Sequence, residues 1–176
     1  MIRTAIRAAT SADLDAVAAL HAEARATYYQ GHLPEADFNG PAERARTREA
    51  WRHALTVGRR RDSGVLAAEY EEALVGVAAY RTTEGVTTLT QFHVSPSMWC
   101  RGIGTHLHIA CVNAWLRAGI RTVRLEVFEP NTRARSFYAR HRWYPDPDNP
   151  RRDTHLVLRL DVPYPAPPGA GRGRSV

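Results

Sequence analysis

The sequence predicts an α/β domain of the layered α+β type, with a mixed, mostly antiparallel central sheet and helices on both faces. Two observations lead to this fold class. Three short apolar runs between residues 65 and 94 are separated only by turns, which is typical of consecutive antiparallel strands. After residue 94 the pattern changes to loop, helix, strand and helix, which predicts a βαβ crossover. The chain has 176 residues, enough to bury one core without disulfides.

The first 57 residues predict one strand and two helices. Residues 2–7 alternate weakly as a strand, and Thr10 with Asp13 resembles a capping box that starts a helix. One face of that helix has apolar residues at three- and four-residue spacing, and His21 lies on the same face. The polar, aromatic stretch from 28 to 41 predicts a loop, and 42–57 predicts a second helix.

The remaining elements follow in order. We expect strands at 65–68 and 74–79 around a turn at 69–72, a turn at Glu84-Gly85, and a strand at 86–94. A helix at 105–118 ends at Gly119, and a strand follows at 120–128. Asn131 caps a helix that runs to about residue 140, and the last strand spans 153–162. The domain therefore covers 1–162, and 163–176 is predicted to be a disordered tail rich in Pro, Gly and Arg.

Composition excludes several classes of protein. Two cysteines cannot form a disulfide framework, so a reducing compartment is expected. No signal-peptide core and no apolar run of ~18 residues is present, so we expect a cytoplasmic protein without membrane contact. The formal charge is +6, but all 24 basic residues are arginines spread along the chain. Without a recognition motif this charge indicates compositional bias, and we expect no nucleic-acid partner.

The segment after the strand at 86–94 has the features of a phosphate-binding loop. Two glycines, Gly102 and Gly104, allow a tight turn and close approach of a ligand to the backbone. A helix that begins there directs free N–H groups and its positive dipole end at that ligand, and Arg101 adds a charge. The motif lacks the Gly-Lys-Ser/Thr ending of a P-loop, and Leu107 replaces the third glycine of a dinucleotide fingerprint.

Two blocks of sequence resemble the GNAT superfamily of acyl-CoA N-acyltransferases. The first is Val94-x-Pro96 followed by Arg101-Gly102-Ile103-Gly104-Thr105, which is similar to the family's pyrophosphate loop. The second is Leu125-Glu126-Val127, then Asn131-x-x-Ala134-x-x-Phe137-Tyr138, then Trp143. Two positions depart from the family pattern. Trp99 stands where Gln or Arg is preferred, and Arg142 replaces a glycine.

The resemblance implies acetyl-CoA as the acyl donor and no metal. The cofactor's pantetheine arm would pair, like an added strand, with the backbone of the strand that ends at Val94, at an edge opened by a local splay. The pyrophosphate would lie on the glycine loop, and the helix N-terminus at Asn131 would contact the arm. The implied cofactor-binding residues are Phe92, His93, Val94, Cys100, Arg101, Gly102, Ile103, Gly104, Thr105, Asn131 and Tyr138.

Acetyl transfer to an amine needs a group that protonates the leaving thiolate and one that accepts the proton of the amine. Tyr138 is the expected acid, because a phenol can protonate a departing thiolate; the alternative is a core aromatic. For the base, Glu126 is ranked first and His93 second, followed by water alone. Gln91, which shares a face with His93, cannot accept a proton, and His93 could instead be a structural hydrogen bonder.

Other interpretations stay open from sequence. Cys100 is placed at a helix N-terminus that would acidify it, but no His–acid pair accompanies it as nucleophilic catalysis requires. A CoA-binding regulatory module without catalysis is the main rival function. The acceptor, a small-molecule amine or a peptide N-terminus, would be shaped by the 28–41 loop, whose polar side chains could receive a small cationic amine. These are Tyr28, Tyr29, His32, Glu35 and Asp37. A spare sheet edge also makes a homodimer conceivable.

Overall fold

A computed structural model describes residues 4–57 and 62–163 of the chain. The predictions for residues 2–3 and for the tail beyond residue 163 lie outside the described residues. The helices are α1 (Leu14–Tyr29), α2 (Glu35–Asn39), α3 (Pro41–Val57), α4 (Ile103–Ala118) and α5 (Thr132–Arg140), with 3₁₀ turns at Ser11–Asp13 and Pro96–Met98. The strands are β1 (Ala5–Ala8), β2 (Gly64–Tyr70), β3 (Ala73–Thr83), β4 (Val86–Val94), β5 (Thr122–Phe128), β6 (Tyr144–Pro145), β7 (Arg151–Arg152) and β8 (His155–Asp161).

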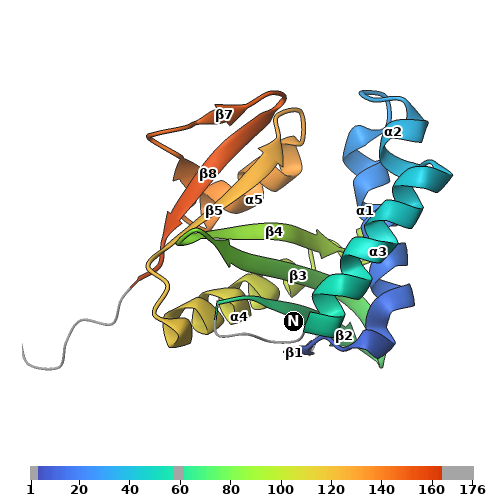
Figure 1. The fold of residues 1–176 in the computed structure, drawn as a ribbon, viewed down its shortest axis with the longest axis horizontal. Coiled ribbons are helices and arrows are strands. Elements are labelled where there is room, and N and C mark those ends of the chain that lie inside the picture. The colour runs from blue at the N-terminus through green and yellow to red at the C-terminus, as the bar shows by residue number, and fades with distance from the viewer. Residues whose placement is uncertain (1–3, 58–61, 164–176) are drawn as a thin grey trace, which may run out of the picture.

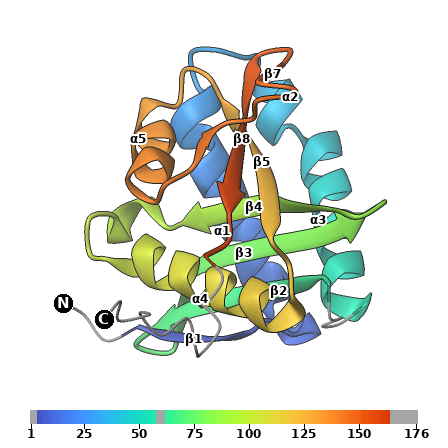
Figure 2. The ribbon, with the colours of Figure 1, turned by 90° about the vertical axis from the view of Figure 1, so that its left-hand side faces the viewer.

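The eight strands form one mixed sheet in the order β1-β2-β3-β4-β5-β8-β6, with β7 also paired to β8. Among the strands of residues 4–57 and 62–163, only β4 and β5 are parallel, and α4 connects them, so the predicted βαβ crossover is confirmed. All other pairs are antiparallel. Helices cover both faces, with α1 and α3 on one and α4 and α5 on the other (Figures 1 and 2). The predicted fold class is therefore confirmed.

Alternate residues of β3 show how the two faces are filled. Val77 and Ala79 pack with Val17, Leu20 and Trp51 of α1 and α3, whereas Ala78 and Tyr80 belong to the larger core under α4 and α5. Trp115 of α4 is fully buried in that larger core, next to Tyr80. Because successive side chains of a strand point to opposite faces, one strand contributes to both cores.

Local sequence signals predicted the ends of most helices and strands to within two or three residues. Thr10 N–H donates to Asp13 Oδ2 at 2.7 Å, so the capping box is present. Asn131 Oδ1 accepts from Ala134 N–H at 3.1 Å, which is the predicted helix cap. Glu84 and Gly85 have φ of 52° and 78°, as a tight hairpin turn requires.

One predicted segment was wrong. Residues 28–41 were expected to form a loop, but Tyr28 and Tyr29 complete α1, and the short helix α2 follows. Burial explains this difference, since Tyr29 and Phe38 pack with Phe128 of β5 in a separate aromatic cluster. Tertiary packing overrides the polar composition of the segment. Within the described residues, no helix combines the length and the apolar character that a membrane crossing would require.

Candidate active site

The site begins at an irregularity in β4. Ala79 pairs with Gln91, but the next residue of β3, Tyr80, pairs with Leu89, so Thr90 is an extra residue in β4. A bulge of this kind bends its strand and increases the local twist. Parallel pairing with β5 is limited to Thr87 with Val123 and Thr88 with Arg124, before the bulge. Beyond it the two strands diverge, as Figure 1 shows. The local splay that the resemblance implied is therefore present.

The divergence leaves backbone groups of β4 on an open edge. Ser95 N–H donates to Val75 O, so the neighbouring pair of Val94 and Gly76 is a non-hydrogen-bonded pair of the antiparallel ladder. The backbone N–H and C=O of Val94 therefore point away from β3. The same alternation applies two residues earlier, at Phe92 opposite Ala78. An extended ligand arm can pair with this edge as an added strand.

The glycine loop follows directly. Gly102 has φ 86° and stands immediately before α4, while Cys100 also has a positive φ of 61°. A Cβ at Gly104 would meet Phe137 Cε2 at 3.1 Å, so this glycine allows the first turn of α4 to pack closely against α5. The first N–H groups of α4 have no partner within the helix and face the same cavity as the loop. An anionic group is stabilised there by these donors and by the helix dipole.

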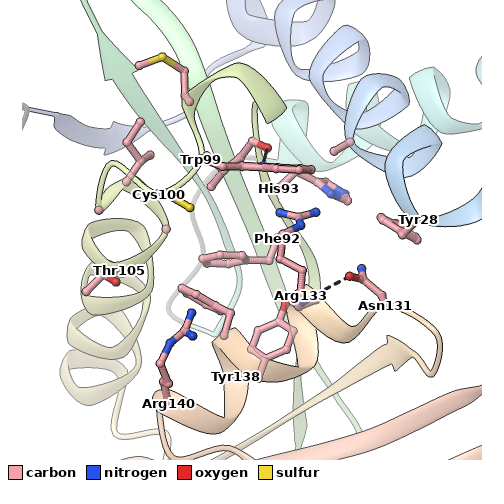
Figure 3. A pocket seen from close by; sticks show the side chains of 18 residues that line it. Tyr28, Phe92, His93, Trp99, Cys100, Thr105, Asn131, Arg133, Tyr138 and Arg140 are labelled. Atoms are coloured by element: carbon pink, nitrogen blue, oxygen red, sulfur yellow. Dashed lines mark hydrogen bonds between the residues drawn. The ribbon is translucent and has the colours of Figure 1, made fainter.

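The open edge and the loop line one cavity of about 230 Å³ between α4 and α5 (Figure 3). Ten of the eleven residues implied as cofactor contacts line it. They are Phe92, His93, Val94, Cys100, Gly102, Ile103, Gly104, Thr105, Asn131 and Tyr138. The structure thus brings together two sequence blocks that are separated by a helix and a strand.

Two of the expected site residues lie elsewhere. Arg101 is exposed and does not line the cavity. Glu126 lies on the sheet face toward α1, the same face as Phe128, and its Oε1 accepts a hydrogen bond from Arg152 Nη1 at 3.0 Å. Its side chain is partly exposed and is not part of the cavity that Tyr138 lines. The structure therefore does not bring Glu126 and Tyr138 together.

Trp99 and Arg133 form a feature that the sequence did not reveal. The Trp99 indole N–H donates to the backbone oxygen of Val94 at 2.9 Å, on the open edge of β4. The Arg133 guanidinium lies 3.2 Å from the centre of the Trp99 ring, reaching across the cavity from α5 (Figure 3). Partial burial of the guanidinium lowers the pKa of Arg133, and no carboxylate among the described residues forms an ion pair with it. The sequence does place Arg133 and Arg140 seven residues apart on one helix face beside the predicted loop, but this spacing indicates no contact with Trp99.

A pair of histidines lies behind the open edge. His93 is opposite Val77 and therefore points to the α1 face, where its ring centre is 4.7 Å from that of His21. His93 Nε2 and Gln91 Oε1 are 2.8 Å apart, and the Trp51 indole donates to His21 Nδ1 at 3.2 Å. Burial lowers the pKa of His21 to about 4 and holds that of His93 well below its usual value. Both imidazoles are therefore neutral near pH 7.

Tyr138 is on the opposite face, among apolar rings. Its ring lies 6.3 Å from Phe92 and 5.7 Å from Trp143, and it is 7% exposed. Burial raises the pKa of Tyr138, so its hydroxyl stays protonated at neutral pH. Tyr138 is thus a core aromatic that also lines the cavity.

The residues expected to receive the acceptor are dispersed. Tyr28 lines the cofactor cavity, while Tyr29 is buried and its hydroxyl lies 3.1 Å from His155 Nε2. His32 packs against Phe128, and Glu35 and Asp37 are exposed on α2. These five side chains do not form a common pocket among the described residues.

A sheet that opens beside a strand edge, and continues into a glycine turn and a helix N-terminus, is the architecture of a CoA-dependent acyltransferase. The acetyltransferase (GNAT) family model matches residues 3–142, and the chain belongs to this family. A comparison with curated proteins found no match.

Solved structures share the fold at low sequence identity. The PaiA N-acetyltransferase of Thermoplasma acidophilum, in complex with coenzyme A, has a TM-score of 0.82 and 17% identity, with 91% of this chain and 99% of that one covered. A GCN5-related N-acetyltransferase from Rhodopseudomonas palustris has a TM-score of 0.71 at 17% identity, with coverage of 92% and 98%. The ribosomal-protein-S18-alanine N-acetyltransferase of Escherichia coli has a TM-score of 0.67 at 14% identity, with coverage of 94% and 98%.

Proposed function

We propose that the protein is an N-acetyltransferase that transfers an acetyl group from acetyl-CoA directly to an amine in a ternary complex. The observation that carries this proposal is the continuous path from the open edge of β4 to the glycine turn at Gly102, with Tyr138 beside it. Family membership and the coenzyme A complex of a structural relative support the donor.

The chain's groups fit such a donor from end to end. Acetyl-CoA would supply the acetyl group as a thioester. Phe92 and Val94 offer backbone partners to an amide-containing arm, while the N-terminus of α4 and Arg133 offer positive charge to phosphates. Binding of the donor along a fixed edge holds the carbonyl in place, which is the main contribution that positioning makes to transfer.

Tyr138 would act as the general acid. As the amine nitrogen forms its bond to the carbonyl carbon, the carbon–sulfur bond breaks and the sulfur leaves as a thiolate. The Tyr138 hydroxyl keeps its proton until this step, because burial raises its pKa, and donates it to the sulfur.

We assign the base to His93. It lines the same cavity as Tyr138, and its imidazole is neutral because burial lowers its pKa. Gln91 Oε1 only accepts, so the neutral ring carries its proton on Nε2, and Nδ1 is the nitrogen that can accept the proton released by the attacking amine. Glu126 remains the alternative base. If the pH–rate profile changes in Glu126→Gln but not in His93→Gln, the assignment moves to Glu126.

Titration calorimetry of the purified protein with acetyl-CoA and with CoA is the first test. Micromolar binding of both, followed by amine-dependent release of thiol, would support the proposal. Binding without thiol release for any amine would favour the regulatory module. Initial rates at varied concentrations of both substrates distinguish direct transfer, with intersecting double-reciprocal lines, from an acyl-enzyme on Cys100, with parallel lines.

A further inference from the structure

A second cavity, of about 510 Å³, lies under α3 on the opposite face of the sheet from Tyr138. Its walls come from α1, α3 and strands β2 to β4, and its apolar part includes Trp51 and Ala79. Thr90 and Gln91 of β4 line it, immediately before the residues of the same strand that line the cofactor cavity. The two cavities therefore meet along β4.

The charge of this cavity is unbalanced. Three arginines line it, at positions 25, 46 and 81, against a single carboxylate, Glu43. Arg25 donates to Glu43 Oε1 at 2.6 Å and Arg46 donates to Oε2, so both carboxylate oxygens are already bonded. Arg81 of β3 has no carboxylate within 4 Å among the described residues. The cavity carries excess positive charge, which favours an anionic group over a cationic one.

An unpaired donor lies at the same wall. The Trp51 indole N–H donates to His21 Nδ1, and an indole N–H can act only as a donor. His21 Nδ1 is therefore the acceptor and carries no proton. Because His21 is neutral, its proton is on Nε2. This nitrogen is buried and has no hydrogen-bond partner within the described part of the chain, and His21 as a whole is 5% exposed. A buried N–H without an acceptor is costly, so an acceptor atom brought close to this nitrogen would be stabilised by it.

The wall between the two cavities is one layer of side chains. His93 lines the cofactor cavity, Gln91 lines the second, and their polar atoms are 2.8 Å apart. His21, which lines the second cavity, is in ring contact with His93. An amine that passes Gln91 therefore comes next to the imidazole assigned as its base, in which Nδ1 is the accepting nitrogen because Nε2 donates to Gln91 Oε1.

We propose that this second cavity is the acceptor site, and that the acceptor is an amine whose other end is anionic, a carboxylate or a phosphate. This inference rests on the proposed function and specifies its substrate class. Arg81 and the exposed side of Arg46 bind the anionic end, because a guanidinium fork matches carboxylate and phosphate oxygens. The amine end is directed past Gln91 toward His93. There the nitrogen bonds to the acetyl carbon, His93 takes its proton, and the thiolate leaves with the proton of Tyr138.

The test compares matched amines with the full-length protein and acetyl-CoA, with thiol release as the readout. Each common amino acid is paired with its α-carboxamide, and O-phosphoethanolamine is paired with ethanolamine, so that the two anionic groups are distinguished. Cadaverine serves as the cationic comparison. We expect the anionic member of a productive pair to have a kcat/KM at least about 10-fold higher, as charge-assisted hydrogen bonds imply.

The variant Arg81→Gln then tests whether the preference for anionic amines arises in the second cavity. We expect it to lower kcat/KM for the anionic member by about 3- to 10-fold, since Arg81 is partly screened by water, and to leave the neutral member unchanged. Arg117→Gln, which removes an exposed arginine from α4 on the far face, is the matched control and should change neither. The KM for acetyl-CoA should stay constant in both variants.

Several results would overturn the inference. These are equal use of both members of every pair, a preference for cadaverine, the same loss in Arg117→Gln as in Arg81→Gln, or no acetylation of any anionic amine by protein that binds acetyl-CoA. If the protein fails to bind acetyl-CoA while folded, the proposed function itself fails, so the two failures are distinguishable.

Discussion

Trp99→Phe should tighten the binding of CoA. In the free protein the Trp99 indole N–H occupies the backbone oxygen of Val94, which is on the edge where the cofactor arm is expected to pair. Phenylalanine lacks the N–H but keeps an aromatic face for Arg133. The substitution therefore removes a competitor for Val94 O without removing the stacking partner of the cation.

The size of the effect follows from one hydrogen bond. The net contribution of such a bond is about 0.5–1.5 kcal/mol, because the free groups would otherwise bond to water. Release of Val94 O should lower the Kd for CoA by about 2- to 10-fold. The phenyl ring also buries less apolar surface than the indole. Because residue 99 is only partly buried in the loop, this difference changes the expected shift in Kd little.

Calorimetric titration of both proteins with CoA measures the change. Arg133→Gln is the informative second variant, since it removes the stacked cation but leaves the indole bond. It should weaken binding because it removes one of the arginine charges that line the cavity. An unchanged or higher Kd in Trp99→Phe would refute the competition between Trp99 and the cofactor arm. Trp99 would then assist the bound state instead.

Three further predictions concern the acid, the loop and the buried histidines. Tyr138→Phe should lower kcat by ~10²-fold with little change in the KM for acetyl-CoA, the pattern of a group that acts in the transition state; steady-state rates measure both, and unchanged kcat would exclude the role. Gly102→Val should abolish CoA binding in a folded protein, because a β-branched residue does not tolerate φ of 86°. Calorimetry measures the affinity for CoA and circular dichroism shows whether the fold is retained; unaltered affinity would contradict the loop assignment. Stability should fall as pH decreases from about 6.5 to 4, since the unfolded chain takes up protons that buried His21 and His108, each with a pKa of about 4, do not bind; the loss is at most about 3 kcal/mol for each group, and urea unfolding at pH 7 and pH 5 would show it.

Local sequence signals were sufficient for the parts of the fold that depend on few residues. Helix caps, glycine turns and apolar alternation are encoded within a window of about ten residues, and Asn131 and Gly119 started or ended helices where expected. The loop at Gly102 was also recognisable, because glycines are needed at fixed positions. The short strands β6 and β7, of two residues each, were not predicted, since so few residues carry no periodicity.

Features that depend on distant contacts could not be derived in this way. The bulge at Thr90 changes which face Leu89 occupies relative to Gln91, and it is visible only from the register with β3. The contact between Arg133 and Trp99 joins two segments 34 positions apart, so no spacing rule predicts it. His21 was expected only as one member of a helix face, whereas its contact with His93 depends on how α1 crosses β4.

The bulge gives β4 its two roles in the proposed reaction. Beyond Thr90, the residues opposite Val77 and Ala79 point toward α1 and α3, and the residue opposite Ala78 points toward α4 and α5. One short segment can thus offer backbone groups of Phe92 to the donor at the open edge and the side chain of Gln91 to the acceptor cavity. A regular strand would have continued its pairing with β5 and closed that edge, because parallel ladder bonds would occupy the same backbone groups. The departure from regular geometry is therefore what allows donor and acceptor to approach a single strand from two directions.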